Sequence, residues 1–165
     1  MNGRENFSAV FDCMIYLQAA ISEKSPAAEL FRQVERGSVL LFVSNETLSE
    51  IRDVLTRPKA LIKYPHLTVE YVEIFLSRVL SKANLLNKIP KHFQYPRDPK
   101  DEKYINLAVE AKADFLVSRD NDLLDLMTGY TNECKDFRRR FRGLKIVNPV
   151  VFLTIIESEI KNETK

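Results

Sequence analysis

The sequence predicts one α/β domain of three layers, in which helices cover both faces of a central, mostly parallel sheet. Short apolar runs without polar alternation recur along the chain, which is typical of strands buried on both faces. Segments with apolar residues at helical spacing lie between these runs, so strands and helices alternate. The chain has 165 residues, 45% of them hydrophobic, which suits one substantial core. We therefore expect a single domain over residues 1–165.

The first predicted strand is the apolar run at residues 7–11, and it stops at Asp12. A helical pattern resumes over residues 14–21, which places Asp12 at a strand-to-helix junction. The Ser-Pro pair at residues 25–26 is a good N-cap and first turn for a second helix, which Gly37 is placed to end.

A second strand is predicted at residues 39–43. Ser44 or Asn45 can cap the helix that follows, and Pro58 forces that helix to end. Glu50 lies beside the apolar stripe of this helix, so its carboxylate can reach the ends of the strands.

The middle of the chain carries weaker patterns. A short helical turn is expected over residues 58–66, and Thr68 caps a helix that extends to Leu80. An edge strand is expected near residues 84–87. Two prolines mark residues 89–96 as a loop.

An acidic helix start follows this loop. Pro99 suits the first turn of a helix, and Asp98, Asp101 and Glu102 place negative charge where the helix dipole favours it. Apolar residues then recur at helical spacing from Tyr104 onward, so one face of this helix packs inward.

The strand predicted at residues 114–118 leads directly into Asp120 and Asp122. In open parallel sheets, ligands bind outside the carboxyl ends of the strands. We expect both aspartates to lie there together with Asp12. A last strand near residues 145–148 and a terminal helix complete the alternation.

Carboxylates therefore fall at predicted strand or helix ends on one face of the domain. They are Asp12, Glu50, Asp98 or Asp101, and Asp120 or Asp122, and all six are candidate metal ligands. Two carboxylates about 4 Å apart repel by roughly 4 kcal/mol at an effective dielectric constant near 20, so such a cluster must bind cations or take up protons. Hard oxygen ligands favour Mg²⁺ or Mn²⁺ over zinc. The alternative is a set of unrelated helix caps, because aspartates are common at such positions.

The amino-acid composition of the chain limits which kinds of partner it can bind. The 25 basic and 23 acidic residues give a net charge of +2, so affinity for nucleic acid must come from local clustering. Two cysteines and no recognisable leader favour a reducing cytoplasm. No apolar run approaches the roughly 18 residues of a membrane span, so we expect no membrane partner.

Residues 128–144 are expected to form an irregular basic insertion. Its cations, interleaved with Phe137 and Phe141, are Lys135, Arg138, Arg139, Arg140, Arg142 and the adjacent Lys145. Arginines can bind phosphates and phenylalanines can stack on unpaired bases, which suits single-stranded RNA. The alternative is a solvated insertion whose phenylalanines anchor it to the domain.

In order and spacing, four stretches of the chain resemble the PIN-domain family, in particular its prokaryotic branch of toxin components of toxin–antitoxin pairs. The resemblance extends over nearly the whole chain, from residue 7 to about residue 156. The four stretches are Val10-Phe11-Asp12, residues 48–51 with 55–59, residues 97–104, and residues 113–124.

This resemblance implies an acidic quartet that holds Mg²⁺ or Mn²⁺, made of Asp12, Glu50, Asp101 and Asp120. Asp98, Glu102 and Asp122 are close alternates. The implied activity is metal-dependent endoribonuclease cleavage, with the metal activating water for attack on a phosphodiester. The implied protein partners are a cognate antitoxin and a second copy of the chain.

One position departs from the family pattern. Many members have Asp-x-Asn after the first strand, whereas this chain has Asp12-Cys13-Met14. Either a thioether replaces an amide near the site, or Met14 faces the core as a gap-filler. The departure leads to an alternative function, a catalytically weakened PIN-like module that binds RNA or a protein. A phosphoacceptor domain is disfavoured, because it leaves Glu50 unexplained.

Overall fold

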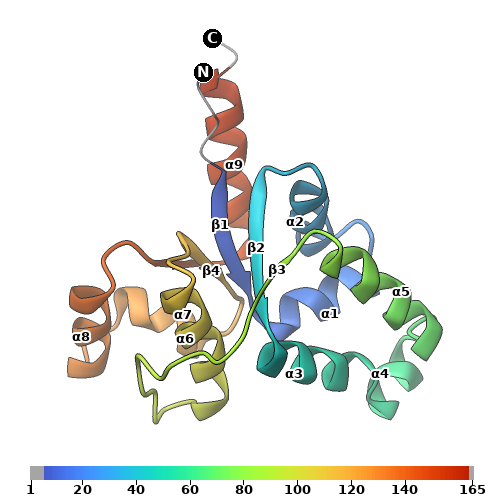
Figure 1. Cartoon of the computed structure of the whole chain (residues 1–165), viewed down its shortest axis with the longest axis horizontal. Helices are drawn as coiled ribbons and strands as arrows, with labels where there is room; N and C mark the ends of the chain where they lie inside the picture. The colour runs from blue at the N-terminus through green and yellow to red at the C-terminus, as the bar shows by residue number, and fades with distance from the viewer. Residues whose placement is uncertain (1–5, 164–165) are drawn as a thin grey trace.

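In the computed structural model, which describes residues 6–163, five strands form one parallel sheet in the order β3-β2-β1-β4-β5 (Figure 1). They are β1 (Phe7–Phe11), β2 (Val39–Ser44), β3 (Asn84–Leu86), β4 (Phe115–Val117) and β5 (Lys145–Val147). Every neighbouring pair is parallel, and each strand lies within a residue or two of its predicted position. The predicted α/β class with a parallel sheet is confirmed.

The helices occupy the stretches between the strands. They are α1 (Cys13–Ile21), α2 (Pro26–Glu35), α3 (Asn45–Leu55), α4 (Pro58–Lys63), α5 (Val69–Leu80), the 3-10 turn η1 (Pro99–Asp101), α6 (Glu102–Glu110), α7 (Asn121–Thr128), α8 (Asn132–Arg140) and α9 (Pro149–Glu163). The side chains of Ser25, Ser44 and Thr68 cap α2, α3 and α5 as predicted. Gly37 follows α2 with φ of 84°, a left-handed conformation that favours glycine. None of the helices within residues 6–163 has the length and hydrophobicity of a membrane-spanning segment.

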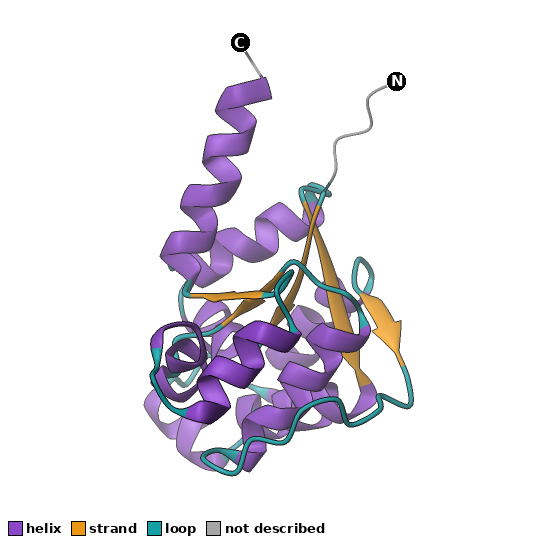
Figure 2. Cartoon of the chain, turned by 90° about the vertical axis from the view of Figure 1, so that its left-hand side faces the viewer, coloured by secondary structure: helices purple, strands orange, loops and turns teal. Residues whose placement is uncertain are grey.

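Side chains of the central strands alternate between two hydrophobic cores. Phe11 and Val117 face the core formed with α1, α2, α3, α5 and α9, whereas Val10 and Leu116 face the core formed with α6, α7 and α8. Successive residues of a strand point to opposite faces, so both faces of the sheet are covered. Figure 1 shows α1, α2 and α5 on one side of the sheet and α6, α7 and α8 on the other, and Figure 2 shows the strands between helices. These are the three layers of the fold.

The register of β1 and β4 brings their carboxyl ends to the same edge of the sheet. Phe11 pairs with Val117, and the next residue, Asp12, donates its backbone N–H to the Val117 carbonyl at 3.1 Å. A long connection over residues 87–98 then carries the chain from edge strand β3 to η1 (Figures 1 and 2).

The prediction that residues 128–144 form an irregular insertion is wrong, because residues 132–140 form helix α8. Thr131 caps this helix by accepting a hydrogen bond from the backbone N–H of Cys134 at 3.2 Å. Cys134 and Phe137 are buried at a spacing of three residues, which is the helical pattern that the dense positive charge obscured.

Phenylalanines anchor α8 to the domain. Phe137 is 0% exposed, and its ring centroid lies 5.2 Å from that of Phe93 and 5.3 Å from that of Phe141. A ring buried in this way is closed to nucleic-acid bases. The geometry therefore favours anchoring over base stacking for Phe137.

We expect Phe137→Ala to lower the free energy of unfolding by about 3–5 kcal/mol, because it opens a cavity in the second core. Urea unfolding followed by circular dichroism measures this. Arg139→Ala is the control on the same helix. The Arg139 side chain is 74% exposed, so its loss should change stability by less than about 0.5 kcal/mol. A Phe137→Ala variant as stable as the wild type would contradict the anchoring role.

Candidate metal centre

Asp12 lies directly after β1 and caps α1. Its Oδ1 accepts a hydrogen bond from the backbone N–H of Ile15 at 3.3 Å, and its Oδ2 accepts one from the hydroxyl of Ser118. The residue is only 4% exposed. Burial raises the pKa of Asp12 to about 6, the charge of Asp120 adds to the rise, and the bond from Ser118 opposes it.

Ser118 joins two of the acidic residues, and it was not among the site residues predicted from sequence. Its hydroxyl donates to Asp12 and accepts from the backbone N–H of Asp120 at 2.9 Å. Its own backbone N–H donates to the carbonyl of Val147, also at 2.9 Å, and the residue is fully buried. A serine directly after a buried strand and before an aspartate is the signal that could have identified it.

Asp98, Asp101 and Asp120 form a cluster in which one carboxylate oxygen from each lies within 4.8 Å of the others. Asp120 caps α7, because its Oδ1 accepts from the backbone N–H of Asp122 at 2.9 Å. The turn η1 brings Asp98 and Asp101 together, with the Asp101 N–H donating to the Asp98 carbonyl at 3.1 Å. We call Asp98, Asp101 and Asp120, together with Asp12, the aspartate cluster.

Asp101 is the most perturbed member of the aspartate cluster. Burial raises its pKa to about 8, and the charges of Asp120, Asp98 and Asp12 add to this rise in that order. Its Oδ2 is buried and has no hydrogen-bond partner within residues 6–163. An unsatisfied buried oxygen of this kind is costly unless a proton or a cation is present.

These residues suit a divalent cation of the hard class. All donors are carboxylate oxygens, which Mg²⁺ and Mn²⁺ prefer. Within the part of the chain that the structure describes, no lysine or arginine forms an ion pair with the aspartate cluster. Its negative charge is thus left for a bound ion to offset.

Glu50 lies near this cluster but already has partners for both carboxylate oxygens. The hydroxyl of Tyr104 donates to Oε1 and the ammonium of Lys103 donates to Oε2, each at 2.7 Å. Burial would raise the pKa of Glu50, but the bonds from Lys103 and Tyr104 outweigh it and the net shift is downward. Burial and the charges of Asp12 and Glu50 raise the pKa of the Cys13 thiol to about 12, which places Glu50 on the Asp12 side of the centre.

Two other predicted alternates, Asp122 and Glu102, have partners outside the cluster. Asp122 accepts from the Arg97 guanidinium at 2.7 Å, and the same arginine binds Asp125 at 2.8 Å. Glu102 accepts from the backbone N–H of Tyr95 at 2.8 Å and lies 3.5 Å from the ammonium of Lys91. The structure therefore does not bring Asp122 or Glu102 to the centre.

Met14 does not face the core. The residue is 43% exposed at the start of α1, two positions after Asp12. The interpretation of Met14 as a core gap-filler is wrong. A solvent-exposed thioether stands at the position where many members of the resembled family have an amide.

The four arginines predicted to bind nucleic acid differ in their contacts. Arg138 donates to the carbonyls of Leu126 and Gly129 at 2.8 Å each, which ties α8 to the end of α7. Arg139 and Arg140 pair with Asp136, and Arg140 also donates to the His92 carbonyl at 2.7 Å. Arg142 is exposed and has no partner among residues 6–163. Internal contacts thus occupy three of the four.

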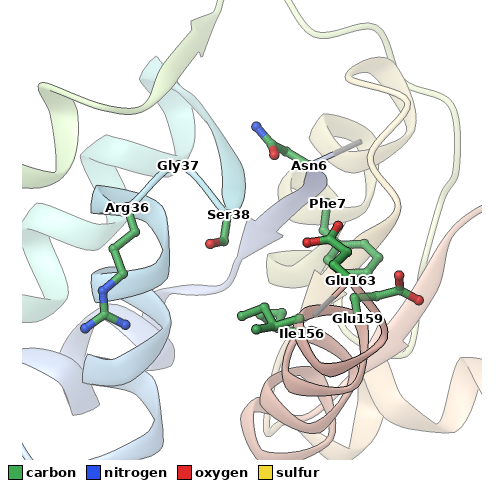
Figure 3. Close-up of a pocket in the computed structure, with 9 residues that line it drawn as sticks. Asn6, Phe7, Arg36, Gly37, Ser38, Ile156, Glu159 and Glu163 are labelled. Carbon is green, nitrogen blue, oxygen red and sulfur yellow. The ribbon is translucent and has the colours of Figure 1, made fainter. Parts of the chain in front are cut away.

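A cavity of about 230 Å³ lies at the opposite end of the sheet (Figure 3). Phe7 at the start of β1, Ser38 before β2 and Ile156 of α9 are among the residues that line it. Since the aspartate cluster lies at the carboxyl ends of β1 and β4, the length of β1 separates the two places.

Comparison with known proteins gives one match. A family model described as a PIN domain matches residues 8–122, which is well over half of the chain. The matched segment begins in β1 and ends in the first turn of α7, so it includes the aspartate cluster and Glu50. No curated protein and no solved structure matches the chain.

We expect Asp101→Asn to stabilise the protein in the presence of chelator at pH 8. With a pKa of about 8 in the folded state and about 4 in the unfolded state, Asp101 binds more protons when folded, so wild-type stability falls as pH rises from about 4 to 8. Asparagine cannot ionise, and its advantage at pH 8 should be on the order of 1–3 kcal/mol and vanish below about pH 4.

Urea unfolding with EDTA between pH 4 and pH 9 measures this difference. Asp53→Asn is the control, since Asp53 is an exposed carboxylate paired with Arg57. An Asp101→Asn variant that is less stable than wild type at pH 8 would contradict the repulsion argument.

Proposed function

The chain belongs to the PIN-domain family, a family of metal-dependent nucleases, and on this premise we propose that it is a Mg²⁺- or Mn²⁺-dependent endoribonuclease. The observation that carries the proposal is the aspartate cluster, with the unsatisfied Oδ2 of Asp101 inside it. Such a group of carboxylates has no evident structural use, because each member raises the energy of the others.

In this proposal Asp98, Asp101 and Asp120 hold the metal and Asp12 supports them from the buried side. A bound divalent ion lowers the pKa of a coordinated water and offsets charge on the phosphate. Ser118 keeps Asp12 and the backbone of Asp120 in fixed positions through its two hydrogen bonds. Asp101 keeps a proton near neutral pH until a cation takes its place.

For Glu50 we propose a positioning role. Its carboxylate holds the ammonium of Lys103, which lies two residues after Asp101 and also donates to the Lys100 carbonyl at 3.0 Å. A cation fixed beside the aspartate cluster can bind a phosphate oxygen of the substrate. In this proposal the active site contains the metal-binding aspartates and, beside them, a lysine that Glu50 holds in place.

A catalytically weakened PIN-like module that binds RNA or a protein is the second candidate. The exposed Met14 favours it, because a thioether cannot donate the hydrogen bond of the asparagine found in many family members. Cleavage activity separates the two candidates.

We also propose a cognate antitoxin protein and a second copy of the chain as partners, and the cytoplasm as the compartment. Exposed apolar side chains on α4 and α5 support a protein partner, since Ile62 is 81%, Val69 61% and Ile74 65% exposed. The toxin role itself depends on finding such an antitoxin.

We expect the protein to cleave a mixed pool of single-stranded RNA with Mn²⁺ or Mg²⁺ and to lose this activity in EDTA. Asp101→Asn and Asp12→Asn should each lower the rate by about 100-fold or more, because each removes a carboxylate that the reaction needs. Gel analysis of end-labelled RNA measures the rate, and Asp53→Asn serves as the control. Cleavage that persists in EDTA, or in both variants, would refute the nuclease assignment.

Glu50→Gln should separate positioning from metal binding. We expect the Kd for Mn²⁺ to change by less than about threefold, whereas the cleavage rate falls about 10- to 100-fold, because Lys103 loses the group that orients it. Lys103→Met should show the same pattern. Isothermal titration with Mn²⁺ and cleavage assays supply the two readouts. A large loss of Mn²⁺ affinity in Glu50→Gln would instead make Glu50 a direct ligand.

A further inference from the structure

Arg119 is an exposed arginine without a partner, placed beside the candidate metal centre. Its neighbours Ser118 and Asp120 both belong to the centre, and the hydrogen bond between them at 2.9 Å fixes the turn that carries Arg119. Within residues 6–163 its guanidinium has neither a hydrogen bond nor an ion pair, unlike that of Arg97. A free guanidinium on a rigid turn is available to bind a ligand.

The Arg119 side chain lines a cavity of about 310 Å³. Leu124 of α7, Gln18 of α1 and Pro26 at the start of α2 contribute to its walls, together with Asn148, Pro149 and Val150 where α9 begins. This volume is at the lower end of the range of about 300–1,000 Å³ for small-molecule sites. None of the described residues that line the cavity is acidic, so its charge comes from Arg119.

Two of the three polar side chains of the cavity, Arg119 and Asn148, present donors, and the amide of the third, Gln18, can donate or accept. Asn148 Oδ1 accepts from the backbone N–H of Val151 at 2.8 Å, which leaves the Asn148 amide N–H₂ to donate. Arg119 adds the fork of donors of a guanidinium. Pro26, Leu124 and Val150 supply apolar surface. A flat ligand with apolar faces and adjacent acceptors on one edge satisfies these groups.

We propose that this cavity binds a guanine base of single-stranded RNA, in the nucleotide next to the phosphate that is cleaved. Guanine presents O6 and N7 as a pair of acceptors, and arginine binds this pair with two parallel hydrogen bonds. Arg119 lines the cavity and the next residue, Asp120, belongs to the aspartate cluster, so the two places adjoin at this turn and in our proposal one nucleotide reaches both. This inference rests on the proposed function, because it needs the phosphate to lie at that cluster.

Binding in EDTA tests the subsite without cleavage. The probes are fluorescent RNA octamers, one made of adenine alone and eight in which a single guanine replaces each adenine in turn. We expect at least one guanine-containing probe to bind wild-type protein about fivefold or more tightly than the all-adenine probe. Arg119→Ala and Arg119→Lys should both lose this preference, since lysine keeps the charge but not the fork. Arg78→Ala removes an exposed arginine on α5 and should keep the preference.

Cleavage of the same probes with Mn²⁺ keeps the two proposals apart. If the subsite exists, wild type should cut beside the guanine faster than at other positions, and Arg119→Ala should cut all positions at similar rates. Equal binding of all probes by the wild-type protein would overturn guanine recognition. An equal loss of affinity for every probe in Arg119→Ala would also overturn it, and would assign Arg119 to a phosphate contact. A guanine preference in EDTA without Mn²⁺-dependent cleavage would instead overturn the nuclease proposal and keep the subsite.

Discussion

Four aspartate side chains are held close together although they repel one another, and much of the surrounding structure maintains this arrangement. The parallel register of β1 and β4 aligns the residues that follow both strands. The buried hydroxyl of Ser118 then binds Asp12 and the backbone of Asp120 at once. The two hydrophobic cores supply the favourable free energy that offsets the repulsion, since they bury apolar side chains on both faces of the sheet.

Three other carboxylates of the domain are paired with lysine or arginine, whereas no described lysine or arginine pairs with the aspartate cluster. Arg97 pairs with Asp122, Lys103 with Glu50 and Lys91 with Glu102. These ion pairs engage Arg97, Lys103 and Lys91 with carboxylates outside the aspartate cluster. A mobile divalent cation is then the species best able to offset its charge.

Positive charge on the surface is divided between structural and free arginines. The guanidinium of Arg138 ties α8 to α7, and Arg139 and Arg140 share Asp136. Arg119 and Arg142 remain without partners in the described chain. With a net charge of only +2, the protein has little general attraction for nucleic acid. Recognition of a nucleic acid would then depend on the positions of the unpaired arginines relative to the aspartate cluster.

The five strands, most helices and their caps could be predicted from the sequence, because hydrophobic period and capping chemistry are local properties. Asp12 and Asp120 were predicted at one end of the sheet because the carboxyl ends of parallel strands meet there, and Asp101 was predicted from an acidic helix start and the family resemblance. Which carboxylates are paired depends on tertiary contacts: Glu50 binds Lys103, 53 residues away, and Asp122 binds Arg97, 25 residues away. The same holds for the burial of Phe137 and for the place of Arg119 at a cavity. Pairing and burial depend on contacts between segments distant in the chain, which no local pattern specifies.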